Sequence, residues 1–155
     1  MKTVFYVSEK TPAALADPGH AADIVSAAQA RNPPLGVTGA LMSAGRYFAQ
    51  VLEGPDEAVD AIMASICKDA RHEKIVILRE SPVDHRLYSD WGLAYLGEAT
   101  YVAGLVEAAI RDPATPLYAE RITRFMREFA HDEKPVRPWG GGLNARAQAG
   151  LIRPT

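Results

Sequence analysis

The chain has 155 residues, of which 48% are hydrophobic and 23% are charged, values that are ordinary for one globular domain. A net charge of −2 gives no basic footprint for nucleic acid, and the single cysteine, Cys67, excludes an intramolecular disulfide and a cysteine-based metal cluster. Because no apolar run reaches the length of a signal peptide or a membrane span, we expect a cytoplasmic protein without membrane contacts.

Residues 2–8 predict a first strand, because β-branched and aromatic residues dominate the segment KTVFYVS. Alternation along the strand puts Val4, Tyr6 and Ser8 on one face. Both faces are rich in apolar residues, so we expect burial on both sides, and the hydroxyl of Tyr6 then needs a hydrogen-bond partner. Residues 9–19 are predicted to form a loop with a short turn at 13–15.

Residues 20–31 predict a helix with a thin apolar face, formed by Ala21, Ile24, Val25 and Ala28. Small residues on that face either pack the helix closely against a sheet or leave a flat slot beside it. Asn32 continues the same line and precedes a proline, so we expect it to leave helical geometry and end the helix. Its amide either serves only to end the helix or points towards a ligand.

Two strands follow, over residues 35–43 and within the segment 45–54, which reads GRYFAQVLEG, with a turn at 44–45 between them. Gly36 and Gly39 lie inside the first of these two strands. Because glycine interrupts a strand where another backbone comes close or where the ladder bulges, one of these two features is expected there.

Gln50 shares a strand face with Phe48 and Leu52, so its amide should be buried. Leaving that amide unpaired would cost about 1 to 3 kcal/mol. Its partner is either a backbone group or ordered water, as for most buried amides, or a bound ligand.

Residues 56–69 predict a second helix, with an apolar stripe formed by Val59, Ile62, Met63 and Ile66. The polar cluster KDARH follows at 68–72. Its Arg71 and His72 either complement the negative end of the helix dipole or bind a phosphate or another polar ligand.

The remaining elements are two strands over 74–80 and 91–96 and two helices over 103–111 and 117–130. Residues 131–155 have prolines, three consecutive glycines and no sustained period, which predicts an extended or disordered tail. The element order predicts an α+β sandwich with a five-stranded mixed sheet. Two helices would cover one face of this sheet, and the two C-terminal helices would cover the other.

Five motifs in order resemble the BLUF domain, the blue-light sensor module that uses flavin. They are FYVS around Tyr6, RNPPLGVTGAL around Asn32, GRYFAQVLEGP around Gln50, KDARH around Arg71 and SDW around Trp91. The resemblance covers residues 2–97 and implies a ferredoxin-like βαββαββ sandwich with the flavin between its two helices. We therefore divide the chain into a flavin-binding domain (1–97), a C-terminal helical pair (98–130) and the tail (131–155).

The resemblance also implies roles for individual residues. Tyr6 would be the electron donor to the excited flavin, and Gln50 would bridge the tyrosine hydroxyl and the N5/O4 edge of the flavin. Asn32 would bond the polar edge of the ring. The ribityl and phosphate portion would be bound by Asp69, Arg71 and His72. FAD is the family's usual flavin, and FMN is the alternative.

Two further positions concern the output of the signal. Trp91 matches a tryptophan whose inward or outward position is debated as part of signalling, and Leu93 stands where many members carry a methionine implicated in passing the signal outward. The resemblance implies electron and proton transfer from Tyr6 through Gln50 that leaves Gln50 rearranged. No substrate turns over, so we expect a photoreceptor and not an enzyme.

We expect a stand-alone photoreceptor, homo-oligomeric as is usual in the family, that signals to an unidentified partner protein through the C-terminal helices. One alternative is a BLUF-like interaction scaffold without photochemistry, against which the presence of Tyr6, Gln50 and Trp91 argues. The other is a small acylphosphatase-like enzyme, which would need an arginine in a glycine-rich phosphate loop, and no such loop is present.

Overall fold

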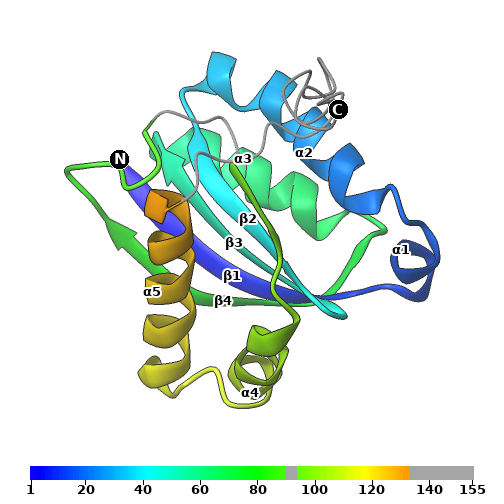
Figure 1. Ribbon diagram of the computed structural model, residues 1–155. Coiled ribbons are helices and arrows are strands. Elements are labelled where there is room, and N and C mark those ends of the chain that lie inside the picture. The colour runs from blue at the N-terminus through cyan, green and yellow to red at the C-terminus, as the bar shows by residue number, and fades with distance from the viewer. Residues whose placement is uncertain (90–93, 133–155) are drawn as a thin grey trace, which may run out of the picture.

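The structure is a computed structural model that describes residues 1–89 and 94–132. Within them, five strands form one sheet in the order β4-β1-β3-β2-β5 (Figure 1). Neighbouring strands are antiparallel except β2 and β5, which are parallel. This confirms the predicted mixed sheet. The strands are β1 (Lys2–Lys10), β2 (Thr38–Ala44), β3 (Tyr47–Gly54), β4 (His72–Pro82) and β5 (Ala94–Glu98).

The helices lie in two layers, one on each side of the sheet. Helices α2 and α3 cover one face, and α4 and α5 cover the other (Figure 1), as the sequence predicts for a ferredoxin-like sandwich with a C-terminal helical pair. Among the described residues, every helix is too short or too polar to span a lipid bilayer. The helices are α1 (Pro12–Ala16), α2 (His20–Arg31), α3 (Asp56–Cys67), α4 (Ala103–Arg111) and α5 (Pro116–Asp132), with short 3-10 turns at Pro33–Leu35 and Thr100–Val102.

The alternation of side chains along the central strands divides the interior into two cores. The core under α2 and α3 takes every second residue of β1 and β3, among them Val4, Tyr6, Phe48 and Leu52. The intervening residues of the same strands pack against α4 and α5, among them Phe5, Val7, Ala49 and Val51. Each central strand therefore contributes one face to each core, and only the backbone of the sheet separates the two cores.

The close backbone approach predicted at the strand glycines occurs at Gly39. A Cβ atom at this position would lie 2.1 Å from the carbonyl oxygen of Val51 on β3. The β2–β3 register is uninterrupted from Thr38 to Ala44, so the close approach involves no bulge. Gly36 lies outside the strand instead, with a φ of 68° that ends the 3-10 turn before it.

The expectation that Asn32 leaves helical geometry is wrong. Asn32 has φ −69° and ψ −44° and continues directly into the 3-10 turn at 33–35. The carbonyl oxygen of Asn32 accepts hydrogen bonds from the backbone N–H groups of Leu35 and Val37, at 3.1 and 3.0 Å. These two bonds hold a compact turn and offset the steric cost of a helical residue before proline.

Several predicted boundaries also shift. Residues 12–16 form a helix because the Thr11 hydroxyl accepts the backbone N–H of Ala14 and caps it. Helix α3 ends at Cys67 rather than at 69, and β4 begins at His72 rather than at 74. The last two residues of β1, predicted as loop, pair with the start of β4, with Lys10 opposite His72.

Candidate functional site

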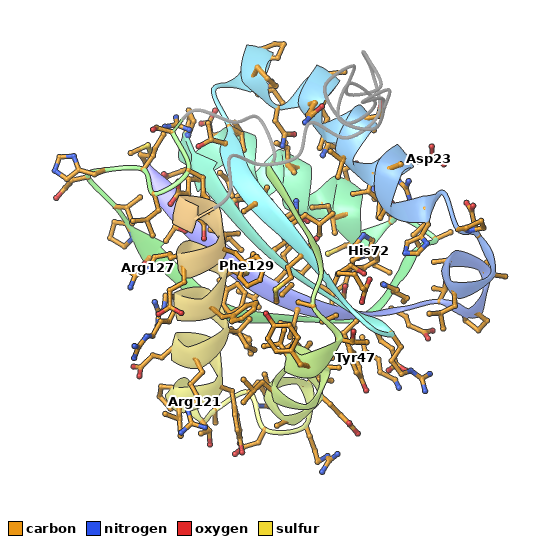
Figure 2. All side chains as sticks on the ribbon, viewed as in Figure 1. Asp23, Tyr47, His72, Arg121, Arg127 and Phe129 are labelled. Atoms are coloured by element: carbon orange, nitrogen blue, oxygen red, sulfur yellow. The ribbon has the colours of Figure 1, made fainter. Side chains whose placement is uncertain are left out.

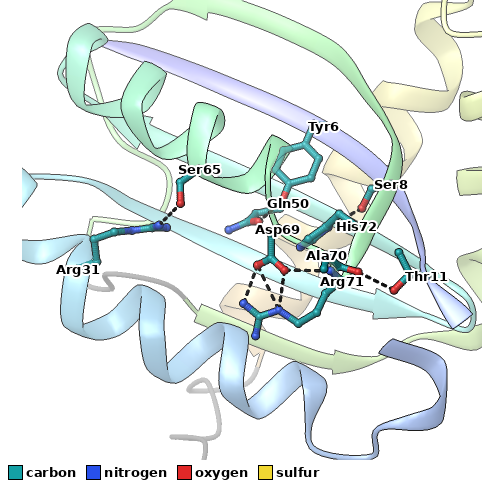
Figure 3. Close-up of polar contacts among 10 residues, drawn as sticks. All are labelled: Tyr6, Ser8, Thr11, Arg31, Gln50, Ser65, Asp69, Ala70, Arg71 and His72. Carbon is teal, nitrogen blue, oxygen red and sulfur yellow. Dashed lines mark hydrogen bonds and ion pairs between the residues drawn. The ribbon is translucent and has the colours of Figure 1, made fainter. Parts of the chain in front are cut away.

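Tyr6 and Gln50 form the centre of the candidate site. They are direct partners in the antiparallel β1–β3 pair, and the Tyr6 hydroxyl donates a hydrogen bond to Gln50 Oε1 (Figure 3). Tyr6 is fully buried and Gln50 is 3% exposed, on the face covered by α2 and α3. Burial raises the pKa of Tyr6, so its phenol holds the proton in the resting state. The pair is therefore a neutral donor and an amide acceptor in an apolar setting.

An imidazole lies beside this pair. His72, the first residue of β4, is buried, and its Nδ1 is 2.9 Å from the hydroxyl oxygen of Ser8. Its ring centroid lies 6.2 Å from that of Tyr6 and 4.9 Å from that of Phe48. Burial lowers the pKa of His72 to about 4, so the ring is neutral at neutral pH.

Asp69 and Arg71, from the turn between α3 and β4, hold each other in place. Arg71 Nε and Nη2 donate to the Asp69 carboxylate at 2.9 and 2.6 Å, and the backbone N–H of Arg71 donates to the same group at 2.9 Å. These bonds lower the pKa of Asp69 and raise that of Arg71. The Arg71 side chain is 31% exposed, and its side-chain bonds to Asp69 use only Nε and Nη2 of the guanidinium group. Asp69 therefore fixes the orientation of the Arg71 side chain.

Asn32 and its neighbour Arg31 bring the end of α2 into the site. Asn32 is fully buried, and its Oδ1 lies 3.4 Å from Arg31 Nε. Arg31 Nη1 donates to the hydroxyl of Ser65 at 3.1 Å and so connects α2 with α3 above the sheet (Figure 3). Asn32 is thus a second buried amide, at the end of α2, besides Gln50 on β3.

Figure 3 shows Tyr6, Gln50, Asp69, Arg71 and His72 together on the α2–α3 side of the sheet, and Asn32 lies at the end of α2, beside Arg31. Trp91 and Leu93 lie outside the described residues. Of the eight site residues predicted from the sequence, six are therefore described by the structure.

Three residues near this site were missed at the level of sequence. The His20 ring packs against Phe48 at 5.6 Å, and its Nε2 is buried without a hydrogen-bond partner among the described residues. Its spacing of four from Ile24, on the apolar stripe of α2, is the signal that could have identified it. Arg31 and Ser65 carried no such signal, because their contact depends on how α2 and α3 are packed.

A flavin fits the residues present at this site. The isoalloxazine ring has a polar edge of carbonyl and ring nitrogen atoms, which suits the buried amides of Asn32 and Gln50. Its ribityl chain and phosphate carry hydroxyl and anionic oxygens, which suit Arg71. The unpartnered Nε2 of His20 is a further polar atom that a bound polar ligand would satisfy.

Comparison with known proteins agrees with this chemistry. The family model BLUF, described as sensors of blue light using FAD, matches residues 1–94. The β subunit of photoactivated adenylate cyclase from Euglena gracilis is 36% identical over 91 residues, which are 59% of this chain and 11% of that protein. The α subunit from the same organism is 34% identical and 9% of its length is covered. The chain thus spans a small part of these cyclase subunits.

Solved structures show the same fold. The dark-state structure of BlrB, a BLUF protein, has a TM-score of 0.67 and 29% identity over 82% of this chain and 95% of that chain. Klebsiella pneumoniae BlrP1, determined with FMN and cyclic diGMP, has a TM-score of 0.57 and 33% identity over 62% of this chain and 25% of that chain.

Proposed function

The chain belongs to the BLUF family of blue-light sensors that use flavin, and we propose that Tyr6 and Gln50 are its photoactive pair. The observation that carries this proposal is the buried hydrogen bond from the Tyr6 hydroxyl to Gln50 Oε1, on the sheet face under α2 and α3. A bound flavin supplies the absorption of blue light and accepts an electron.

Within the protein, the hydroxyl of Tyr6 holds a proton that burial keeps in place at rest. A phenol that loses an electron becomes a strong acid, and its hydrogen bond to Gln50 Oε1 is the path along which the proton leaves. An amide can both accept and donate, which a carboxylate at neutral pH cannot. Gln50 is therefore the group that changes its hydrogen bonds and stores the light signal.

We propose FAD as the flavin, following the description of the family, with FMN as the alternative because it is present in the BlrP1 structure. Asn32 and Gln50 would hold the polar edge of the ring. Arg71, oriented by Asp69, would bind the phosphate, with His72 beside it. Release of the flavin by heat and its chromatographic identification test this assignment.

The output of the signal is proposed to run through α4 and α5 to a partner protein, without catalysis by this chain. Both helices pack against the reverse side of the strands that carry Tyr6 and Gln50, so a change in those strands reaches them directly. A cytoplasmic location and a homo-oligomer belong to the same proposal. Size-exclusion chromatography in darkness and light tests the oligomer.

A direct experiment tests the function as a whole. Purified protein should be yellow and should show a reversible red shift of flavin absorption under blue light. A colourless, flavin-free preparation that takes up neither FAD nor FMN would contradict the proposed function.

A further inference from the structure

A cavity of about 300 Å³ lies on the side of the sheet opposite Gln50, between β1, β3 and β4 and helix α5. Phe5 of β1 and Val51 of β3 contribute its apolar wall. These two residues directly neighbour Tyr6 and Gln50 in sequence. An occupant of the cavity would therefore contact the reverse side of the strands that carry the photoactive pair.

The lining of this cavity is rich in positive charge. Arg79 of β4 and Arg124 and Arg127 of α5 all contribute to it, and Figure 2 shows Arg127 on the β4 side of α5. Arg124 forms an ion pair with Glu128 one turn further along the helix. Arg79 and Arg127 have no ion-pair partner in the part of the chain that the structure describes. Although Glu120 also lines the cavity, the balance of charge favours an anionic occupant.

Tyr88 supplies a second, independent observation. Tyr88 lines the cavity and is 1% exposed, and its hydroxyl is buried without a hydrogen-bond partner among residues 1–89 and 94–132. The residue itself is fixed, because its backbone N–H donates to the buried carboxylate of Glu53 at 3.0 Å. Burial, together with this carboxylate, raises the pKa of Tyr88, so its hydroxyl remains a donor. A buried donor without an acceptor is rare in folded proteins.

We propose that this cavity binds a small organic anion, with its apolar body against Phe5 and Val51 and its carboxylate or phosphate group held by Arg79, Arg127 and the hydroxyl of Tyr88. Guanidinium groups pair well with both kinds of head group. The volume is at the lower end of the range for small-molecule sites, so the occupant is compact. This site is separate from that of the flavin and does not depend on the photochemistry.

Calorimetric titration of the flavin-loaded full chain tests the proposal. Phenyl phosphate and benzoate share an aromatic body and differ in their anionic group, and benzyl alcohol is the neutral control. At least one anion should bind about tenfold more tightly than benzyl alcohol and should raise the Tm. The anion that binds identifies the head group. The proposal is wrong if benzyl alcohol binds as tightly as the anions, if neither anion binds, or if the probe displaces the flavin.

Three variants locate the binding. Arg79→Gln should weaken binding about tenfold, as expected for loss of a charge-assisted hydrogen bond. Tyr88→Phe removes only the hydroxyl and should weaken binding about threefold without lowering the Tm of the ligand-free protein, because no internal hydrogen bond is lost. Arg121→Gln, at an exposed position of α5 that does not line the cavity, should bind like the wild type (Figure 2).

Two results with these variants would overturn the proposal. If Arg121→Gln weakens binding as much as Arg79→Gln, the anion binds the charged surface of α5 and not the cavity. If Tyr88→Phe binds the probe like the wild type and has a lower Tm, the hydroxyl serves a hydrogen bond within the chain. The flavin content of each sample is measured in parallel, so a loss of flavin is distinguished from a loss of the anion site.

Discussion

Tyr6 and Gln50 are paired across β1 and β3, so the hydrogen bond between their side chains is set by the register of two central strands. Their neighbours Phe5 and Val51 face the opposite core, under α4 and α5. The backbone of these strands is thus the shortest connection between the proposed photoactive pair and the proposed output helices.

Tyr6→Phe should abolish the reversible red shift while flavin binding persists, because the variant keeps the ring and removes the donated proton. Loss of the buried hydrogen bond to Gln50 should also lower the free energy of unfolding by about 1 to 2 kcal/mol. Absorption spectra and urea unfolding measure the two effects. Tyr47→Phe is the matched control, since Tyr47 is on β3 but faces the other core, and it should keep the shift.

Acidification should destabilise the protein through His72. Its pKa is about 4 in the folded state against 6.5 for an unperturbed histidine, so between these values only the unfolded state carries the proton. The contribution of the neutral His72 ring to the free energy of unfolding is therefore complete above pH 6.5. As the pH falls towards 4, the free energy of unfolding decreases by about 3 kcal/mol in total. Urea unfolding at several pH values measures it. His72→Gln should lack this slope, and an unchanged slope in that variant would show that another group causes it.

Arg71→Gln should discriminate between flavins. If Arg71 binds the phosphate, the variant should bind FMN and FAD about tenfold more weakly and should bind riboflavin, which has no phosphate, as the wild type does. Titrations followed by flavin fluorescence measure this difference. Arg111→Gln removes an exposed arginine that pairs with Glu107 on α4 and should change nothing. Equal weakening for all three flavins would place Arg71 away from the phosphate.

Gly39→Ala should destabilise the sheet strongly, because the new methyl group would lie 2.1 Å from the carbonyl oxygen of Val51. Relief requires separation of β2 from β3, and we expect a loss of about 3 kcal/mol. Gly104→Ala is the control, since a methyl group there meets no atom within 4 Å in helix α4. That variant should gain about 0.5 to 1 kcal/mol. Urea unfolding compares them, and a tolerated Gly39→Ala would mean that the strands are not in close contact.

The sequence was sufficient to predict the layers of the fold and the faces of its strands. Period-2 alternation correctly grouped Tyr6 with Val4 on one strand and Gln50 with Phe48 and Leu52 on another, and helices 20–31 and 103–111 have the predicted bounds. These features depend on local patterns of apolar residues, which can be read directly from the sequence. That Tyr6 and Gln50 lie together was implied only by the family resemblance.

Features that depend on pairing between distant segments were not predictable in the same way. The end of β1 reads as loop, since its strand structure comes from pairing with the start of β4. The buried carboxylate of Glu53 accepts the backbone N–H groups of Leu87 and Tyr88, a contact between residues more than thirty positions apart. The helical geometry of Asn32 was mispredicted because the turn after it supplies two hydrogen bonds that a pre-proline rule does not include.

Light-minus-dark absorption spectra of the flavin-loaded wild type and of Gln50→Leu show whether Gln50 takes part in the photochemistry. Leucine fills a volume similar to that of glutamine and cannot accept the proton of Tyr6. We predict a reversible red shift in the wild type and no shift in Gln50→Leu, with flavin bound in both. A normal, reversible shift in Gln50→Leu would show that Gln50 is not the acceptor of the Tyr6 proton.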